Sequence, residues 1–143
     1  MHVKNVKTIA VDARDYNDEE KFDRVLVDAP CSGLGTLRKK PDIKWKRDLG
    51  DIRKLNATQK ELLRKGASLV KVGGYLVYST CTIDASENYE IINDFLMENP
   101  DFEIEKAGSI FDPELIDDHG CVHTYTNVHE IDGSFAARLK KIR

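Results

Sequence analysis

Two apolar runs of this chain each end in a polar turn that carries a cysteine. Residues 25–31 read Val-Leu-Val-Asp-Ala-Pro-Cys and residues 78–82 read Tyr-Ser-Thr-Cys-Thr, so Cys31 and Cys81 each follow a strand-like segment. Open α/β sheets place their chemistry at such strand ends. Because cysteine is a nucleophile that forms covalent intermediates, the two turns predict a site built from a pair of thiols, with Asp28 beside the first.

Each of these residues also has an ordinary structural interpretation. A cysteine at a strand end often packs as a small apolar side chain, and Asp28 could simply cap its turn. Two other function classes stay open as well. One is a thiol-redox protein, which no Cys-x-x-Cys spacing supports. The other is a non-enzymatic RNA-binding module in which the cysteines are incidental.

Between the two cysteines the chain is strongly basic. With a formal charge of −3 over the whole sequence, any affinity for nucleic acid must come from such a local cluster or from another domain. Basic runs are commonly solvated surface, but one that contains an aromatic residue can also contact phosphates and bases. The cluster comprises Arg38, Lys39, Lys40, Lys44, Lys46 and Arg47, with Trp45 among them.

A second group of chemically active side chains is His119, Cys121 and His123. If residues 119–123 form a strand, the three side chains share one face, and imidazole and thiolate are both zinc ligands. No fourth ligand is evident. We therefore predict no metal site.

The elements that must position these residues follow from the hydrophobic pattern. Leu55, Leu62 and Leu69 recur every seven residues and predict an amphipathic helix over 51–71, which the glycines at 73 and 74 end. A second helix is predicted over 85–98. Predicted strands cover residues 8–11, 22–27, 75–78, 102–104 and 134–139. Residues 15–21 form a loop or a short helix, residues 32–48 form a loop, and residues 107–131 are left without a firm assignment.

Strands that alternate with helices predict an α/β fold, with a parallel sheet and right-handed crossovers. The run at 25–27 is apolar on both faces, which favours a strand covered by helices on both sides. The 143 residues form one domain by this interpretation.

Composition limits the class of protein further. The chain is 41% hydrophobic and 33% charged, as in ordinary globular proteins, and no apolar run approaches the roughly 20 residues that cross a bilayer. No secretory signal is visible at its start. Three cysteines far apart suggest no disulfide framework. We therefore expect free thiols and a cytoplasmic location.

Five segments resemble the RNA 5-methylcytosine methyltransferases, above all their bacterial 16S ribosomal RNA branch. Two are the cysteine turns at 28–33 and 79–82. The others are the basic segment that ends in Pro-Asp-Ile-Lys-Trp at residue 45, the Glu87-Asn88 pair, and residues 132–139, which resemble the Asp-Gly-Phe-Phe strand of the family with Ser134 in place of an aromatic residue. The likeness covers nearly the whole chain in the family's order.

The resemblance implies a role for several residues. The cofactor would be S-adenosylmethionine and the substrate RNA. Cys81 would attack carbon 6 of cytosine, Cys31 would serve the release step, and Asp28 would contact the base near the cofactor. Asp12 would lie on the adenine side of the cofactor. The RNA-binding residues would be Arg38, Lys39, Lys40 and Lys44.

The chain also departs from the family's pattern. It contains no glycine-rich turn of the type Ala-Ala-Pro-Gly-Gly-Lys, and the likeness begins only at Val11 and Asp12. The family's sheet has strand order 3-2-1-4-5-7-6. Residues 1–143 therefore resemble the C-terminal part of a catalytic domain, a partial Rossmann-like sheet that lacks its first two strands and the family's N-terminal RNA-binding domain.

Two expectations follow from the missing glycine-rich turn and the missing first two strands. The chain alone should be inactive and should bind the cofactor feebly, because half of the cofactor pocket is missing. Residues 8–11, equivalent to the third strand, should pair with residues 25–27, remain loose, or join a dimer through the exposed sheet edge.

Overall fold

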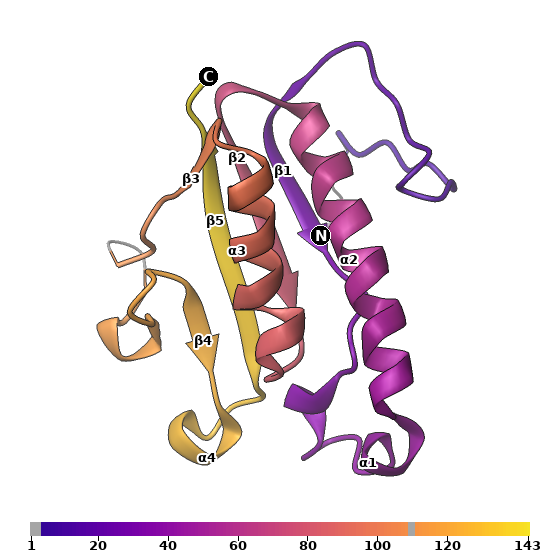
Figure 1. Ribbon diagram of the computed structural model, residues 1–143, viewed down its shortest axis with the longest axis vertical. Helices are drawn as coiled ribbons and strands as arrows, with labels where there is room; N and C mark the ends of the chain where they lie inside the picture. The colour runs from indigo at the N-terminus through magenta and orange to yellow at the C-terminus, as the bar shows by residue number, and fades with distance from the viewer. Residues whose placement is uncertain (1–3, 109–110) are drawn as a thin grey trace.

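The computed structural model describes residues 4–108 and 111–143 and shows one mixed sheet with two long helices packed on it (Figure 1). The start of the chain, where the sequence predicts no secretory signal, lies partly outside the described residues. The strands are β1 (Phe22–Asp28), β2 (Val70–Thr80), β3 (Phe102–Ile104), β4 (Val122–Thr124) and β5 (Ser134–Lys141). The α-helices are α1 (Ile43–Lys46), α2 (Leu49–Leu69), α3 (Tyr89–Glu98) and α4 (Thr126–His129).

The strand order is β1-β2-β5-β3, with β4 paired to the other part of β5. β1 and β2 are parallel, whereas β5 runs antiparallel to β2, β3 and β4. This order matches strands 4-5-7-6 of the sheet that the resemblance implies, so the predicted partial Rossmann-like fold is confirmed. Because β1 and β2 are parallel, their carboxyl ends lie at the same edge, where Asp28 is opposite Ser79.

The predicted strand at residues 8–11 is wrong. These residues are an exposed loop with no ladder to β1, and Ile9 and Val11 are about half exposed. A strand exists only where its backbone groups pair with a neighbour. The expected pairing of these residues with residues 25–27 is therefore not found in the described chain.

Helix α2 begins two residues before the predicted start, because Asp48 and Asp51 form a reciprocal capping box at its N-terminus. It ends at Leu69, and β2 begins at once with the buried Val70. The two glycines therefore lie within the strand, where Gly73 takes a positive φ of 80°. The predicted helix end and strand start are both shifted for this reason.

The predicted helix over 85–98 is interrupted at Asn88. A 3-10 turn (Ala85–Glu87) precedes α3, and Asn88 has φ −114° and ψ −106° between them. The side chain of Asn88 accepts a hydrogen bond from the Thr80 hydroxyl and donates one to the Thr82 carbonyl. These bonds hold Asn88 against the end of β2, which breaks the helix.

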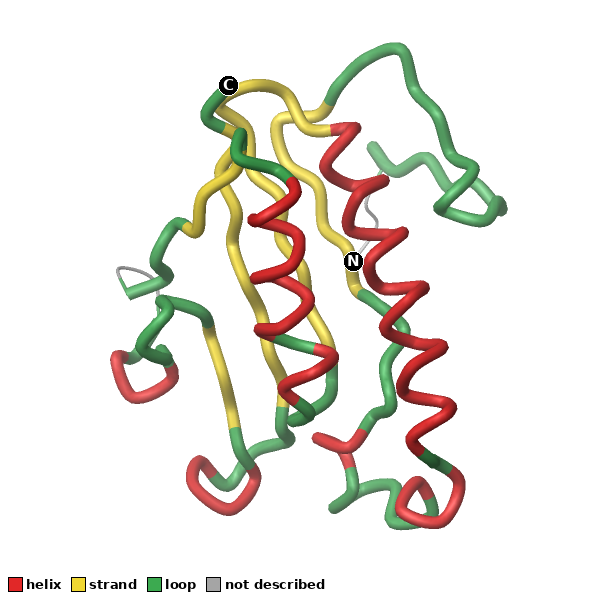
Figure 2. The backbone as a smooth tube through the Cα atoms, viewed as in Figure 1, coloured by secondary structure: helices red, strands yellow, loops and turns green. Residues whose placement is uncertain are grey.

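Both long helices cover the same face of the sheet (Figure 2). The core lies between them and the alternate residues of β2 and β5 that face them, such as Leu76, Tyr78 and Phe135. On β1, Leu26 points the other way and is 67% exposed. The prediction of helices on both sides of this strand is therefore not met in the described chain.

The two segments for which the sequence predicts no helix or strand contain short elements. Residues 32–48 include a 3-10 turn (Leu34–Thr36) and the four-residue α1. Residues 107–131 include a 3-10 turn (Pro113–Leu115), β4 and α4. Within the described ranges, no helix combines the length and the apolar character needed to cross a membrane.

Candidate functional site

The sulfur atoms of Cys31 and Cys81 lie 3.2 Å apart. Cys31 follows β1 and Cys81 follows β2, so the parallel pairing of these strands brings residues distant in sequence together. The backbone N–H of Cys81 also donates to the sulfur of Cys31, at 3.3 Å. The two predicted thiols thus meet at the same edge of the sheet, and both are free.

The two thiols differ in their surroundings. Cys81 is exposed, whereas Cys31 is partly buried. Burial, and then the hydrogen bond with Cys81, raise the pKa of the Cys31 thiol to about 12. Cys31 is therefore protonated at neutral pH, and Cys81 is the sulfur that an incoming molecule can reach.

Backbone hydrogen bonds join three loops around the pair of cysteines. Gly35 donates its N–H to the carbonyl of Cys81 at 3.1 Å, and Gly133 donates to the carbonyl of Gly35 at 2.8 Å. A Cβ on Gly35 would come within 1.9 Å of the Gly133 carbonyl oxygen. Glycine is therefore required at residue 35 by close approach of two backbones. The turn before β5 becomes part of the site in this way.

Asp28 lies at the carboxyl end of β1 and is exposed. Its carboxylate accepts a hydrogen bond of 2.8 Å from the hydroxyl of Ser79, its partner across the β1–β2 ladder. The hydrogen bond from Ser79 thus orients one carboxylate oxygen of Asp28. The structure places Asp28 at the same sheet edge as the cysteines, as the sequence predicts.

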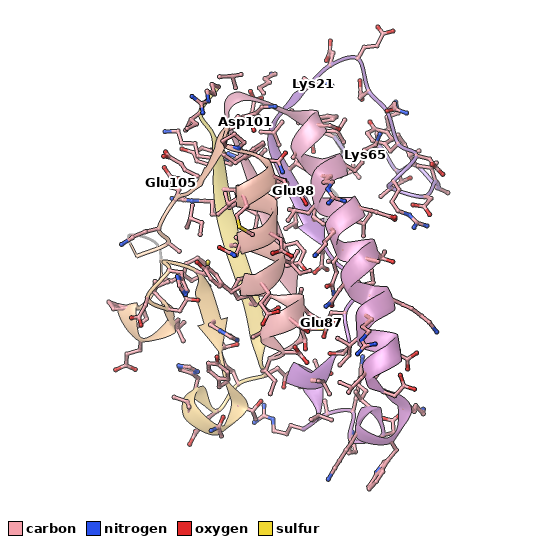
Figure 3. All side chains as sticks on the ribbon, viewed as in Figure 1. Lys21, Lys65, Glu87, Glu98, Asp101 and Glu105 are labelled. Carbon is pink, nitrogen blue, oxygen red and sulfur yellow. The ribbon has the colours of Figure 1, made fainter. Side chains whose placement is uncertain are left out.

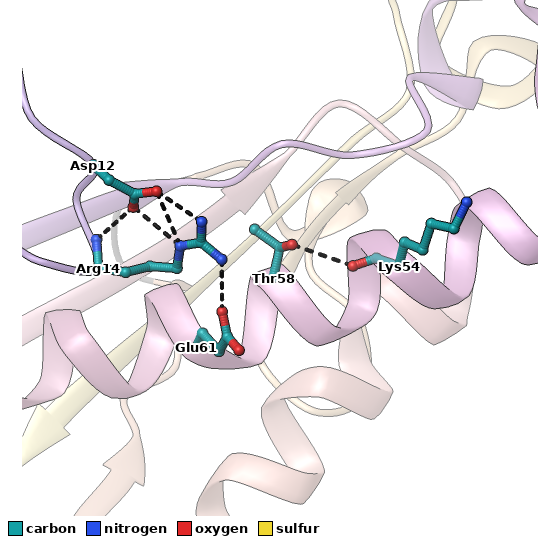
Figure 4. A network of polar contacts seen from close by, with 5 residues as sticks. All are labelled: Asp12, Arg14, Lys54, Thr58 and Glu61. Carbon is teal, nitrogen blue, oxygen red and sulfur yellow. Dashed lines mark hydrogen bonds and ion pairs between the residues drawn. The ribbon is translucent and has the colours of Figure 1, made fainter.

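Asp12 lies in the segment before β1 and makes a local cluster (Figure 4). The guanidinium of Arg14 pairs with Asp12 at 2.7 Å and with Glu61 of α2 at 2.9 Å. Hydrogen bonds from Arg14 lower the pKa of Asp12 to about 2. In this arrangement Asp12 helps to attach the N-terminal segment to α2.

A cavity of about 340 Å³ lies between that segment and β1. Its lining is mostly apolar and includes Val11 and Ala13, which flank Asp12, and Asp28 at the end of β1. An apolar slot with a few polar groups is typical of a site for a small organic molecule. The residues present fit one side of an adenosine-type cofactor. The backbone amides of a glycine-rich turn, which would approach its other side, have no counterpart in this sequence.

The basic cluster divides into two parts in the structure. Lys39 pairs with Asp132 at 2.7 Å, and Arg38 lies 3.8 Å from the same carboxylate and donates to the Glu130 carbonyl. These two cations therefore tie the cysteine loop to the turn before β5. Lys40 and Lys44 are exposed.

Trp45 follows on α1 and is 81% exposed, with the ammonium of Lys44 5.3 Å from its ring centre. It thus presents an open aromatic face among cations, beside the loop that carries Cys31.

His119, Cys121 and His123 do not converge as one set. His119 stacks on Tyr89 at 3.6 Å, Cys121 is buried, and His123 bonds the Tyr125 hydroxyl. Among the described residues, no group of three or more metal-ligating side chains is arranged to hold an ion. Only residues 122–124 of this stretch form a strand, so the shared face does not arise.

Sequence reasoning gave no role to a buried polar cluster behind the cysteines. It comprises Ser32, Gln59, Thr82 and Glu87, each at most 1% exposed. Two signals were present in the sequence. Glu87 belongs to one of the segments that resemble the family, and Gln59 lies four residues from both Leu55 and Leu63, so a polar side chain interrupts the apolar stripe of α2. The partners of Gln59 become visible only in the fold.

Comparison with known proteins shows strong similarity over this region. The chain is 36% identical to ribosomal RNA small subunit methyltransferase F of Serratia proteamaculans over 97% of its own length and 30% of that protein. It is 55% identical to the probable ribosomal RNA small subunit methyltransferase B of Bacillus subtilis over 60% of its length and 19% of that protein. The chain thus spans less than a third of the length of these curated relatives.

Solved structures agree with the sequence relatives. NSun6 from Pyrococcus horikoshii, solved with SFG, superposes with a TM-score of 0.81 and 31% identity over 99% of this chain and 36% of that one. PH0851 gives a TM-score of 0.86 and 37% identity over 94% of this chain and 31% of that one. The family model described as 16S rRNA methyltransferase RsmB/F matches residues 1–140. The chain therefore belongs to the RsmB/F family of ribosomal RNA methyltransferases.

Proposed function

We propose that a polypeptide containing this chain methylates carbon 5 of a cytosine in 16S ribosomal RNA, through a covalent bond between Cys81 and carbon 6 of the base. The observation that carries the proposal is the 3.2 Å approach of the Cys31 and Cys81 sulfurs at the carboxyl ends of parallel strands. Family membership supports methyl transfer to ribosomal RNA. The cofactor is S-adenosylmethionine, in keeping with a solved relative that holds the analogue SFG.

The exposure of the two sulfurs separates their roles. Carbon 5 of cytosine is a weak nucleophile, and addition of a thiolate to carbon 6 makes it reactive. Cys81 forms this bond, because it is exposed whereas Cys31 is partly buried. The cofactor supplies the methyl group as an electrophilic carbon.

Release of the product then needs two bond changes. The proton on carbon 5 leaves to a base, and the bond between carbon 6 and Cys81 breaks, which returns the thiolate. The resemblance assigns Cys31 to this release step, and its sulfur lies 3.2 Å from that of Cys81. Asp28 accepts a hydrogen bond from the cytosine amino group while Ser79 holds its other side. The target base must leave its stack to enter the site.

The test is a covalent trap with RNA that contains 5-azacytidine. It uses a polypeptide that joins this chain to a glycine-rich cofactor turn. We expect a stable protein–RNA adduct with the unchanged sequence and none with Cys81→Ala. Cys31→Ala should still form an adduct, because that residue acts after attack. An adduct that survives Cys81→Ala would refute the assignment.

The chain by itself should bind the cofactor product S-adenosylhomocysteine weakly. Only one side of the cofactor pocket is formed by residues such as Val11, Ala13 and Asp28. Isothermal titration should give a dissociation constant well above the micromolar range. Micromolar binding would show that the expected glycine turn is not needed.

RNA binding is proposed for the exposed cations near the cysteines. Since Arg38 and Lys39 contact the 130–132 turn, Lys40, Lys44 and the ring of Trp45 are freer to meet phosphate and base. The binding constant for single-stranded RNA falls as salt rises, and the slope of its logarithm against the logarithm of salt concentration reports how many phosphates are neutralised. Removing one cation that neutralises a phosphate should reduce the size of this slope by about 0.7. The double variant of Lys40 and Lys44 to Ala should therefore reduce the slope by about 1.4.

A matched control is Lys21→Ala, because Lys21 lies at the opposite end of the sheet from the carboxyl ends of β1 and β2 (Figure 3). Because Lys21→Ala removes one charge and the double variant removes two, a reduction of about 0.7 from Lys21→Ala would mean that the basic cluster has no special role. If instead RNA binding persists after removal of both thiols and no adduct ever forms, the binding-module interpretation is favoured.

A further inference from the structure

Glu87 is a fully buried carboxylate directly behind the cysteine pair. It lies between the start of α3 and α2 (Figure 3), with 0% of its side chain exposed. No lysine or arginine forms an ion pair with it in the part of the chain that the structure describes. A buried charge is costly unless donors surround it. The burial of this carboxylate therefore requires hydrogen-bond donors around it.

Three donors converge on this carboxylate. The backbone N–H of Ser32 and the side-chain amide of Gln59 both donate to Oε1, at 2.9 and 3.0 Å. The hydroxyl of Ser32 donates to Oε2. An ionised carboxylate only accepts hydrogen bonds, so it matches a set made entirely of donors.

These donors are attached to both sides of the cysteine site. Gln59 also donates to the carbonyl of Pro30 at 2.9 Å, so Glu87 and Gln59 together hold the residues immediately before and after Cys31. The hydroxyl of Ser32 is 2.8 Å from that of Thr82, which follows Cys81. One carboxylate therefore links α2 and the turns after β1 and β2.

We propose that Glu87 is a positioning residue that sets the spacing between the Cys31 and Cys81 sulfurs. The inference deepens the proposed function, and rests on it for its catalytic meaning. Without the carboxylate, the buried N–H of Ser32 loses its acceptor and the amide of Gln59 keeps only the Pro30 carbonyl, so the Cys31 turn relaxes away from Cys81. A displacement of about 1 Å can slow a reaction between positioned groups about a hundredfold.

The conservative variant Glu87→Gln should keep the spacing. Its amide oxygen can accept the same two donors at the Oε1 position. Its amide nitrogen faces the hydroxyl of Ser32, which can accept and turn its own proton toward Thr82. Glu87→Leu has similar volume and no acceptor, so it removes the links while filling the space.

The spacing can be measured as closure of a disulfide in this chain. Diamide oxidises the two thiols to one disulfide and is itself reduced to the hydrazine, taking up both protons. We expect the unchanged chain and Glu87→Gln to close the Cys31–Cys81 bond at rates within about threefold of each other. Glu87→Leu should be slower by about tenfold or more. Peptide mapping identifies the bond, and a rate independent of protein concentration shows that it is intramolecular.

Controls separate positioning from stability. Ile92→Val removes a buried methyl group of α3, and Ile92 makes none of the hydrogen bonds to the carboxylate, so the variant should lower the thermal midpoint and leave the closure rate unchanged. If Glu87→Leu does not fold, Gln59→Met removes one donor and should also slow closure. Closure of Glu87→Leu at the unchanged rate, with only a lower midpoint, would overturn the proposal.

This experiment is independent of methyl transfer. A failed 5-azacytidine trap together with Glu87-dependent closure would reject the proposed function and keep the positioning role. Closure that fails even in the unchanged chain would show that the sulfurs do not meet, which overturns the inference.

Discussion

Two cysteines only 3.2 Å apart have different surroundings in this protein. Cys31 is partly buried and its pKa is raised to about 12, mainly by desolvation, while Cys81 is exposed. The two identical side chains thus differ in how readily an incoming molecule can reach their sulfur atoms.

Alkylation should reveal this difference. With iodoacetamide near pH 8, Cys81 should be modified first, Cys31 more slowly, and the buried Cys121 last. Exposure and the raised pKa of Cys31 are the reasons. Mass spectrometry of timed samples gives the order, and in Cys81→Ala the remaining thiols should stay slow. Faster modification of Cys31 than of Cys81 would contradict the assignment of roles.

Alkaline pH should destabilise the fold through its buried thiols. Burial raises the pKa of Cys121 from 9.0 to about 12. Below pH 9 the thiol is protonated in both states, so its contribution to stability is fully present. Between pH 9 and about 12 the unfolded chain loses a proton that the folded chain keeps, and the free energy of unfolding falls. Urea unfolding from pH 8 to 10.5 should show a flatter decline for Cys121→Ala. Parallel declines would be inconsistent with this pKa.

At the scale of elements, the site depends on loops that touch backbone to backbone. The turn after β1, the turn after β2 and the turn before β5 meet at Gly35, Cys81 and Gly133. No side chain intervenes, so the spacing of these loops is set by glycine.

Gly35→Ala should therefore destabilise the protein. The added Cβ would lie 1.9 Å from the carbonyl oxygen of Gly133 and 2.9 Å from that of Cys81, so backbone must move. We expect the free energy of unfolding to fall by about 1–3 kcal/mol, the usual range for overpacking. Gly108→Ala is the control, because a Cβ there has nothing within 4 Å. Equal urea midpoints for the two variants would argue against close backbone contact between these loops.

At the scale of the molecule, the sheet is covered on one face and open along β1. Leu26 is 67% exposed on the uncovered face, and residues 8–11 leave the outer edge of β1 unpaired. Unpaired strand edges with apolar side chains favour association.

We expect this chain to self-associate through that edge as its concentration rises. Leu26→Lys should weaken association, because a charged side chain on an edge strand opposes pairing. Met97→Lys is the matched control, since Met97 is 70% exposed on α3, away from the edge. Sedimentation velocity over a range of concentrations measures the effect. Association that responds equally to both variants, or that is absent in the unchanged chain, would refute the role of the edge.

Much of the architecture could be predicted because it is encoded in local pattern. The seven-residue spacing of leucines predicted α2 to within two residues at each end. The apolar runs before Cys31 and Cys81 predicted β1 and β2, and parallel pairing then required the two turns to meet. The position of the thiol pair follows from those strands and their direction.

Other features depend on contacts between distant residues. Residues 8–11 have the composition of a strand, yet a strand needs a neighbour to satisfy its backbone, and none pairs with them here. Residues 122–124 are too short to predict and exist as β4 because β5 lies beside them.

The buried carboxylate of Glu87 shows the difference between what local sequence pattern predicts and what only the packing of the fold decides. Local pattern along the chain was enough to place Cys31 and Cys81 at the ends of neighbouring strands. The family resemblance includes Glu87, but its hydrogen-bond partners Ser32 and Gln59, which lie 55 and 28 positions away in the sequence, became visible only in the fold. Periodicity reports which face of an element is buried, whereas the partners of a buried charge are set by three-dimensional packing.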